Sequence, residues 1–241
     1  MKIQGLEITP QPRKSEESEN YYFVPVGSLG VYLPRCTEIL GTVGNDWLAK
    51  WYGRVGIDEA ERVSGEAMAI GSEVHYWVEQ ILKGHIITPD EWAGIVEPAK
   101  NGIRAFVRFQ KEWGCKAYSD EFVEKTVYSV EDGYAGTLDM VGITGFPTGK
   151  SSTILVDWKT SKQHDQKHVV QLGAYHHALL KCNPGMKVNG GMIGRLDKLT
   201  GIPDMRYITL KELRAGWECY KHILKVWYYF NGDRVAKENM S

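Results

Sequence analysis

Two aspartates and a lysine are the residues of this chain whose types and spacing best suit hydrolytic chemistry. Asp139 lies in the segment Tyr-Ala-Gly-Thr-Leu-Asp-Met-Val-Gly at 134–142, and Asp157 and Lys159 lie in Ile-Leu-Val-Asp-Trp-Lys-Thr at 154–160. Both segments are rich in apolar and β-branched residues and are bounded by glycine-rich or polar turns, which predicts two strands. Burying an acid and a lysine on an otherwise apolar strand costs free energy unless the two charges pair or bind a metal. Their presence therefore indicates pairing, metal binding or a part in a reaction.

The alternation of side chains along a strand decides which of them share a face. Asp157 and Lys159 are two residues apart, so they project to the same side of the predicted strand. The apolar side chains of the same strand point the other way, toward a core; these are Ile154, Val156 and Trp158.

The carboxylates and the ammonium suit the hydrolysis of a phosphodiester. Asp139 and Asp157, near strand ends, can bring two carboxylates to one hard divalent cation, because such cations select oxygen ligands. The ammonium of Lys159 can orient a water molecule or stabilise charge on the attacked phosphate, and the sequence leaves open whether it also accepts a proton. The plain alternatives are two surface aspartates beside turns and a lysine that only forms an ion pair with Asp157.

Five short motifs between residues 71 and 175 resemble the PD-(D/E)XK nuclease superfamily in its RecB-like branch. A triplet such as Asp-Trp-Lys occurs by chance in many proteins, so the number and order of the motifs carry the resemblance. The motifs are Gly71-Ser-Glu-Val-His75, Glu124 within Phe-Val-Glu-Lys-Thr at 122–126, Gly136-Thr-Leu-Asp139, Asp157-Trp-Lys159 and Gln171-Leu-Gly-Ala-Tyr175.

The resemblance implies a function for each of these residues. A divalent cation, Mg²⁺ or Mn²⁺, is expected to be held by His75, Asp139, Asp157 and the main-chain carbonyl of Trp158. The catalytic set is expected to comprise Lys159, Asp139, Asp157, Glu124, Gln171 and Tyr175. Two assignments keep plain alternatives: a single histidine on a helix is more often a surface or core residue, and Glu124 is explained equally well by an ion pair with Lys125.

Contacts with DNA are expected from a short helix predicted over 45–54. Lys50 and Arg54 share one face of that helix, and Trp47 and Trp51 share another. Such side chains suit phosphate contacts and base stacking in a single-strand channel, although a place in the core is the commoner role of an aromatic residue. The resemblance adds three DNA contacts, at Gly71, Gln171 and Tyr175.

The order of the predicted elements gives the fold class. Helices are expected at 45–54, 66–83, 95–113, 166–181 and 211–230, and strands at 121–129, 134–144, 152–160, 188–197 and 204–210. We therefore expect an α/β fold: a restriction-endonuclease-like core, with helices flanking a mixed central sheet, and a helical N-terminal cap. With 241 residues, the chain suits one domain. It divides into a flexible arm over 1–20 and a single nuclease domain over 21–241, with a mainly helical cap over 21–120 and the catalytic core over 121–241.

Composition limits the cofactors and the cellular compartment. The formal net charge of −1 gives no global signature of a nucleic-acid binder, although a local basic groove is compatible with it. The four cysteines, at 36, 115, 182 and 219, form no C-x-x-C pair, which argues against a zinc site or a disulfide framework. Some RecB-like relatives hold an iron–sulfur cluster on cysteines after the last motif, where this chain has two, so no cluster is expected. No apolar run is long enough to span a membrane, and the cytoplasm of a bacterial or phage-infected cell is the expected location.

These features together predict a metal-dependent DNA exonuclease that hydrolyses phosphodiester bonds from DNA ends or in single strands. Recombination, repair or genome maintenance would suit such an enzyme, including in a phage. The segment Pro34-Arg-Cys-Thr-Glu-Ile-Leu40 agrees in part, since it is similar to the LPSVT-x-IL motif of phage-type and mitochondrial genome maintenance exonucleases but differs at Arg35 and Cys36. Two alternatives stay open: a structure- or site-specific endonuclease of the same fold, and a catalytically inactive DNA-binding subunit.

Overall fold

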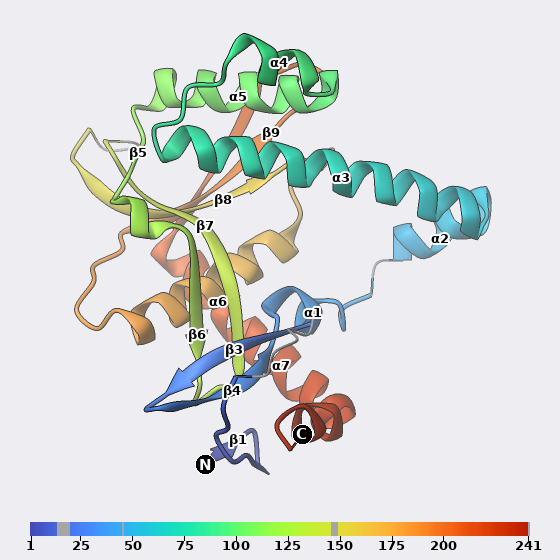
Figure 1. Ribbon diagram of the computed structural model, residues 1–241, viewed down its shortest axis with the longest axis vertical. Coiled ribbons are helices and arrows are strands. Elements are labelled where there is room, and N and C mark those ends of the chain that lie inside the picture. Colours follow the sequence, from blue (N-terminus) through green and yellow to red (C-terminus); the bar gives the residue numbers. More distant parts are fainter. Residues whose placement is uncertain (14–19, 45, 146–148, 241) are drawn as a thin grey trace.

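The structure, a computed structural model, describes residues 1–13, 20–44, 46–145 and 149–240, without the side chains of Asp46 and Trp47. Within these residues, a mixed sheet of six strands forms the middle of the molecule (Figure 1). Its strands are β5 (Lys116–Ala117), β6 (Val123–Ser129), β7 (Tyr134–Thr144), β8 (Ser152–Lys159), β9 (Gly190–Leu196) and β10 (Pro203–Thr209). The strand order is β10-β9-β8-β7-β5, and β6 also pairs with β7. All neighbours are antiparallel except β8 and β9, which run parallel.

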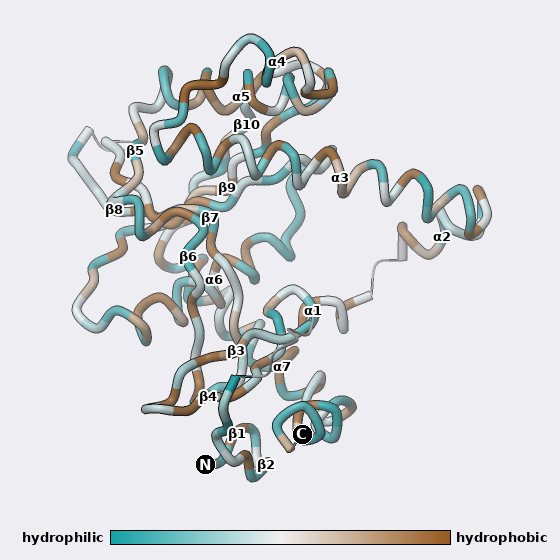
Figure 2. The backbone as a smooth tube through the Cα atoms, viewed as in Figure 1, coloured by the Kyte–Doolittle hydropathy of each residue, from teal (hydrophilic) through white to brown (hydrophobic). Residues whose placement is uncertain are grey.

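Helices cover both faces of this sheet. The helices α3 (Ile57–Leu82) and α5 (Glu97–Trp113) pack on one face, and α6 (Gln166–Cys182) and α7 (Leu210–Glu238) pack on the other. Figure 2 shows hydrophobic and hydrophilic residues alternating along α3 and α5, as expected of helices that turn one side to a core. The molecule is therefore an α/β protein in which helices flank a curled mixed sheet, as the sequence predicts at that level.

The strand β8 divides its side chains between the two faces as its alternation predicts. Ile154, Val156 and Trp158 are fully or almost fully buried in the core on the α5 side. The indole of Trp158 meets the rings of Phe106 and Phe109 edge-on, with centroids 5.2 and 5.1 Å away. Because this anchor fixes the strand, Asp157 and Lys159 are left on the side that faces α6.

Two glycines let α6 lie unusually close to α7. A Cβ atom on Gly173 would stand 2.5 Å from the main-chain nitrogen of Trp217, and one on Gly216 would stand 2.5 Å from the carbonyl oxygen of Val169. Neither position has room for a side chain. This close packing fixes the position of α6 over the sheet.

The N-terminal segment differs from the flexible arm expected over residues 1–20. The strands β1 (Lys2–Ile3) and β2 (Leu6–Glu7) pair with each other, and Ile3 and Ile8 are 0% and 2% exposed. These apolar side chains join the core on the α7 side, which explains why a mostly polar segment is held in place. Residues 14–19 of the expected arm lie outside the described residues.

The segment 21–120, expected to be mainly helical, contains, among its described residues, four helices longer than five residues besides one hairpin and one shorter helix. It opens with a hairpin of β3 (Tyr21–Val26) and β4 (Leu29–Pro34), followed by α1 (Cys36–Leu40). The helix predicted from 66 begins nine residues earlier, at Ile57, and an unpredicted short helix, α4 (Pro89–Gly94), precedes α5. The side chains of Thr88 and Glu91 cap α4 reciprocally. The helix α2 (Asp46–Val55) forms as predicted and lies at the outer end of α3 (Figure 1).

Candidate functional site

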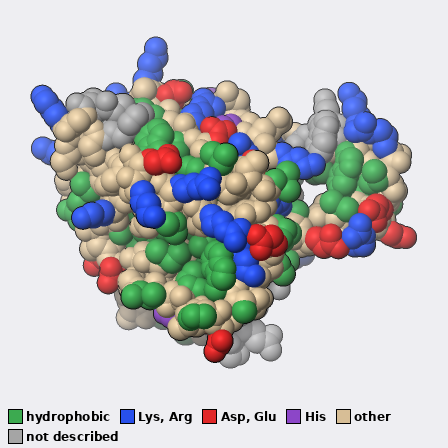
Figure 3. Space-filling model, turned by 90° about the horizontal axis from the view of Figure 1, so that it is seen from above, with side chains coloured by type: hydrophobic (Ala, Val, Ile, Leu, Met, Phe, Trp, Pro, Cys, Tyr) green, Lys and Arg blue, Asp and Glu red, His purple; other side chains and the backbone are tan. Residues whose placement is uncertain are grey.

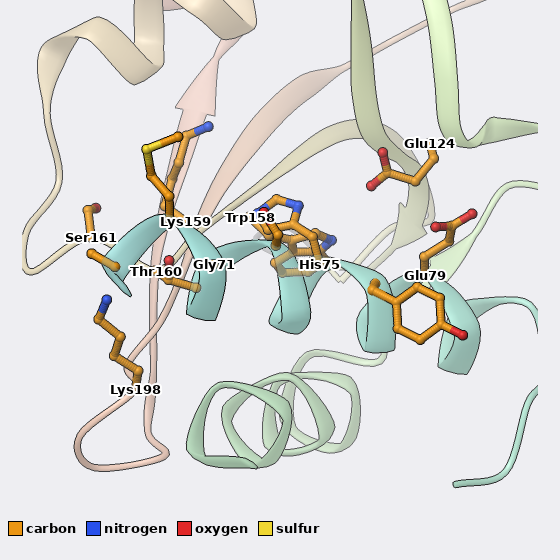
Figure 4. A pocket seen from close by; sticks show the side chains of 13 residues that line it. Gly71, His75, Glu79, Glu124, Trp158, Lys159, Thr160, Ser161 and Lys198 are labelled. Atoms are coloured by element: carbon orange, nitrogen blue, oxygen red, sulfur yellow. The ribbon is translucent and has the colours of Figure 1, made fainter. Parts of the chain in front are cut away.

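A cleft of about 710 Å³ opens between one side of α3 and the end of β8. Gly71, His75 and Glu79 follow one another along the wall that α3 forms. Figure 4 shows Glu79 and Glu124 at one end of the cleft, Ser161 and Lys198 at the other, and His75 between them. The residues that line the cleft are Ala67, Met68, Gly71, Ser72, His75, Tyr76, Glu79, Glu124, Trp158, Lys159, Thr160, Ser161 and Lys198.

Three side chains from three elements converge beside this cleft. His75 comes from α3, Glu124 from β6 and Asp139 from β7, and one donor atom of each lies within 4.8 Å of the others. The nearest pair is Nδ1 of His75 and Oδ1 of Asp139, 3.6 Å apart. This is the one group of three or more His, Cys, Asp or Glu side chains, among the described residues, with a geometry that suits a metal ion.

Glu124 reaches this group through a strained main chain. Its φ angle is +51°, in the left-handed region that a glutamate rarely adopts. It sits within β6 opposite Asp139, because the residues on either side of it pair with Met140 and Leu138 of β7. Burial, and then the Asp139 carboxylate, raise the pKa of Glu124 to about 8. Strain and like-charge repulsion at one position are expected where function, rather than stability, selects the residue.

Asp139 is held by the main chain of β8. Its Oδ2 accepts a hydrogen bond from the N–H of Trp158 at 2.5 Å, while its Oδ1 faces His75. In an extended strand the N–H and C=O of one residue face the same neighbour, so the carbonyl of Trp158 also turns toward β7. The ligand function that the resemblance implies for this carbonyl stays a prediction.

Asp157 forms an ion pair with Lys159, two residues after it in β8. The Nζ of Lys159 lies 2.9 Å from Oδ1 and 2.7 Å from Oδ2 of Asp157, and the aspartate side chain is only 2% exposed. Burial by itself would lower the pKa of Lys159, but the carboxylates of Asp157 and Asp139 outweigh it and the pKa is raised. The structure thus gathers Glu124, and not Asp157, with His75 and Asp139, while Asp157 holds the ammonium in place.

Gln171 and Tyr175 are buried next to Lys159. The Nζ of Lys159 donates to Oε1 of Gln171 at 3.2 Å, and Nε2 of Gln171 donates to the Tyr175 hydroxyl at 3.0 Å. The two side chains are 8% and 4% exposed, and the ring of Tyr175 fills the space that a Cβ atom on Gly136 would occupy. Both residues therefore support the lysine through this chain of hydrogen bonds, and their contact with DNA stays a prediction.

Gly71 occupies a close approach between α3 and the segment after β8. A Cβ atom at this position would stand 3.1 Å from Oγ1 of Thr160. Gly71 lines the cleft, so the missing side chain keeps the cleft open toward Lys159. DNA contact by Gly71 stays a prediction.

The sequence did not single out Glu79 and Lys198. Glu79 lies one turn beyond His75 and forms an ion pair with Lys83 at 2.5 Å, and its charge contributes to the raised pKa of Glu124. The four-residue spacing of Gly71, His75 and Glu79 is the signal that predicts it, since such residues share a helix face. Lys198 comes from the turn between β9 and β10, and no sequence pattern connects it with the site.

The residues of α2 do not line the cleft. Lys50 and Arg54 are exposed at the outer end of α3, and the ring of Trp51 meets that of Tyr52 edge-on with centroids 5.5 Å apart. The side chain of Trp47 lies outside the described residues. DNA contact by Lys50, Trp51 and Arg54 stays a prediction.

The cysteines are dispersed over the molecule. Cys36 and Cys115 are buried in different core clusters, and Cys219 is exposed. Cys182 is half-buried, and its Sγ forms hydrogen bonds with the main-chain N–H and C=O of Tyr128. Among the described residues, no helix combines the length and the apolar composition needed to cross a membrane.

Comparison with known proteins gave little. No family model and no curated protein matched the sequence. One solved structure, "Crystal structure of SSO0001", is similar over 67% of this chain and 72% of its own chain, with 12% sequence identity and a TM-score of 0.31. A likeness at this level carries no argument about function.

Proposed function

We propose that this chain is a divalent-cation-dependent phosphodiesterase that hydrolyses DNA, with a restriction-endonuclease-like core of the PD-(D/E)XK, RecB-like kind. One observation carries the proposal: His75, Glu124 and Asp139 converge beside a cleft into which Lys159 also opens. The order of elements supports it, because the antiparallel strands β6, β7 and β8 bring the acidic residues and the lysine together and α6 then supplies the lysine's support.

The converging residues fit a divalent cation. Glu124 and Asp139 supply hard oxygen ligands, and an imidazole such as that of His75 is a suitable further ligand for Mn²⁺. Among the described residues, Glu124 forms no ion pair, and the charge of Lys83 only partly offsets the burial and like charges that raise its pKa. A bound Mg²⁺ or Mn²⁺ would polarise a phosphodiester and lower the pKa of a water molecule beside it. The Trp158 carbonyl would be a fourth donor.

The remaining residues orient a phosphate and compensate its charge. Lys159 is held by Asp157 and Gln171, so its ammonium is preorganised and little conformational entropy is lost when it meets a phosphate. Lys198 adds a second positive charge at the far end of the cleft. A strand of nucleic acid lying along α3 would thus have its attacked phosphate near His75 and further backbone near Lys198.

DNA as the substrate, and free ends as the point of attack, are supported by the sequence motifs and by α2. The exposed Lys50 and Arg54 and the half-buried Trp51 offer phosphate contacts and a stacking surface that do not depend on base sequence. They stand beyond the cleft along α3, where a strand leaving the site would meet them (Figure 1).

The test is digestion of end-labelled linear DNA, single- and double-stranded, by the purified full chain. We expect hydrolysis with Mg²⁺ or Mn²⁺, none in a chelator, recovery on adding the cation back, and a colourless protein without an iron–sulfur absorbance band. Lys225→Ala, on the exposed surface of α7, is a control that should keep full activity. DNA binding without any hydrolysis in Mn²⁺ would instead identify an inactive binding subunit, and full activity in the chelator would overturn the proposal.

A further inference from the structure

A second concave surface lies on the opposite side of α3 from the cleft. It encloses about 520 Å³ between the end of α3, α4 and α5, and it shares no lining residue with the cleft. We call it the α4–α5 groove. It is lined by Ile81, His85, Ile86, Ile87, Trp92, Ile103, Arg104, Val107, Arg108 and Lys111.

The floor of the α4–α5 groove is apolar and open to solvent. Ile86 is 85% exposed, so its side chain contributes little to the core of the protein. Beside it lie the half-buried Ile87, Trp92 and Val107. Figure 3, which views this face, shows hydrophobic side chains gathered on it with Lys and Arg side chains beside them. Exposed apolar surface collected in a concavity is typical of a binding site rather than of a free surface.

The rim of the groove carries one sign of charge. Arg104, Arg108 and Lys111 follow at i, i+4 and i+7 on α5, so they line one side of the helix, and the lining includes no Asp or Glu. Arg104 is neutralised by Glu97 at 2.5 Å and lies over the ring of Trp92. Among the described residues, Arg108 and Lys111 form no ion pair. The groove therefore combines an apolar floor with at least two uncompensated positive charges.

We propose that the α4–α5 groove docks an acidic peptide segment of a partner protein, with apolar side chains of the segment on the floor and its carboxylates at Arg108 and Lys111. Charge complementarity favours this occupant, since a neutral apolar peptide would leave the charges of Arg108 and Lys111 without an anionic partner. A nucleic-acid backbone would use the cations but leave Ile86 and Val107 uncovered. The surface lies away from the cleft, so a docked partner would leave the path to His75 open.

Fluorescence anisotropy with labelled synthetic peptides tests the proposal on the full chain. One peptide is rich in glutamate around a Leu and a Phe; a second replaces the glutamates by glutamine, and a third replaces Leu and Phe by serine. We expect the first to bind with a dissociation constant below about 100 μM and the other two to bind at least about tenfold more weakly. The variants R108E/K111E and Ile86→Asp should each weaken the first peptide at least about tenfold. Both changes are at exposed positions, so folding should be kept, and DNA hydrolysis should be unchanged.

Lys225→Glu, a charge reversal on the exposed surface of α7, is the matched control and should leave the affinity for the peptide intact. The proposal is overturned if the acidic peptide fails to bind, or if its binding survives R108E/K111E. It is also overturned if a single-stranded oligonucleotide displaces the peptide and loses affinity in R108E/K111E, which would make the groove a nucleic-acid surface. Self-association that Ile86→Asp abolishes would assign the groove to a second copy of the chain.

Discussion

Glu124 of β6 and Asp139 of β7 face each other across an antiparallel pair, between the paired residues Val123 and Met140 on one side and Lys125 and Leu138 on the other. Like charges placed in this way repel, and Glu124 holds its position with a φ angle of +51°. Both features lower the stability of the isolated protein. A divalent cation between the two carboxylates would remove the repulsion, and this coupling makes the candidate centre accessible to stability measurements that do not depend on activity.

Cation binding should therefore stabilise the fold. We expect Mn²⁺ to raise the melting temperature of the wild type, because a ligand that binds only the folded state shifts unfolding by mass action. Asp139→Asn and His75→Ala should remove most of the shift, as measured by differential scanning fluorimetry with and without the cation. Glu218→Gln, which removes an exposed carboxylate on α7, should respond like the wild type. An equal shift in all four proteins would mean that the cation binds elsewhere.

The effect of the cation should depend on pH in a defined direction. The pKa of Glu124 is raised to about 8, so folding favours its protonated form, and the contribution of this carboxyl to stability is lost as the pH rises from about 4.5 toward 8. A cation bound at Glu124 would compensate the charge of its carboxylate in place of the proton. We expect the stabilisation by Mn²⁺ to be larger at pH 8 than at pH 5.5, and Glu124→Gln to make the cation-free protein less sensitive to pH over this range. A shift that is larger at the lower pH would contradict the assignment.

Loss of the lysine or of the carboxylate that holds it should impair chemistry more than DNA binding. We expect Lys159→Ala to lower the turnover number by about a hundredfold or more, because the ammonium stabilises charge that develops in the transition state. Asp157→Asn should lower it by orders of magnitude as well, yet bind DNA at least as tightly, since a negative charge near phosphate is removed. Single-turnover rates and equilibrium binding separate the two effects. Near-normal rates in either variant would place the reaction elsewhere.

A requirement for DNA ends should be visible on circular substrates. If a strand passes from the cleft along α3 toward α2, linear single strands should be shortened progressively, while a covalently closed single-stranded circle should resist. Gel analysis of both substrates at the same enzyme concentration makes the comparison. Rapid cutting of the circle would favour an endonuclease of the same fold.

An added methyl group between α6 and α7 should lower the stability of the fold. Gly173→Ala is expected to lower the free energy of unfolding by about 1–3 kcal/mol, because its Cβ atom would collide with the main chain of α7. Gly94→Ala is the matched control: no atom lies within 4 Å of the added Cβ, and we expect a change within about 0.5 kcal/mol. Chemical denaturation measures both. Equal stability of the two variants would show that the helices separate without cost.

The sequence determined the local elements around the site and the direction of their side chains. The alternation in β8 was enough to predict that Asp157 and Lys159 share one face and Trp158 the other, because a strand has a period of two whatever it packs against. Gly71, His75 and Glu124, which the motifs single out, line one cleft in the fold, and their function stays a prediction. The buried N-terminal strands were missed, because Ile3 and Ile8 are too few in a polar segment to give a period.

Only the tertiary structure decided which groups meet. The fold pairs Asp157 with Lys159 and puts Glu124 opposite Asp139, so Glu124 joins His75 and Asp139 in one group. That choice depends on strand register and on the unusual φ angle of Glu124, and neither is encoded in a local pattern. The fold also buries Gln171 and Tyr175 beside Lys159, where Gln171 bonds to both the lysine and Tyr175. The α4–α5 groove arises where the end of α3, the segment after it, α4 and α5 come together, so its combination of exposed Ile86 with Arg108 and Lys111 exists only in the folded chain.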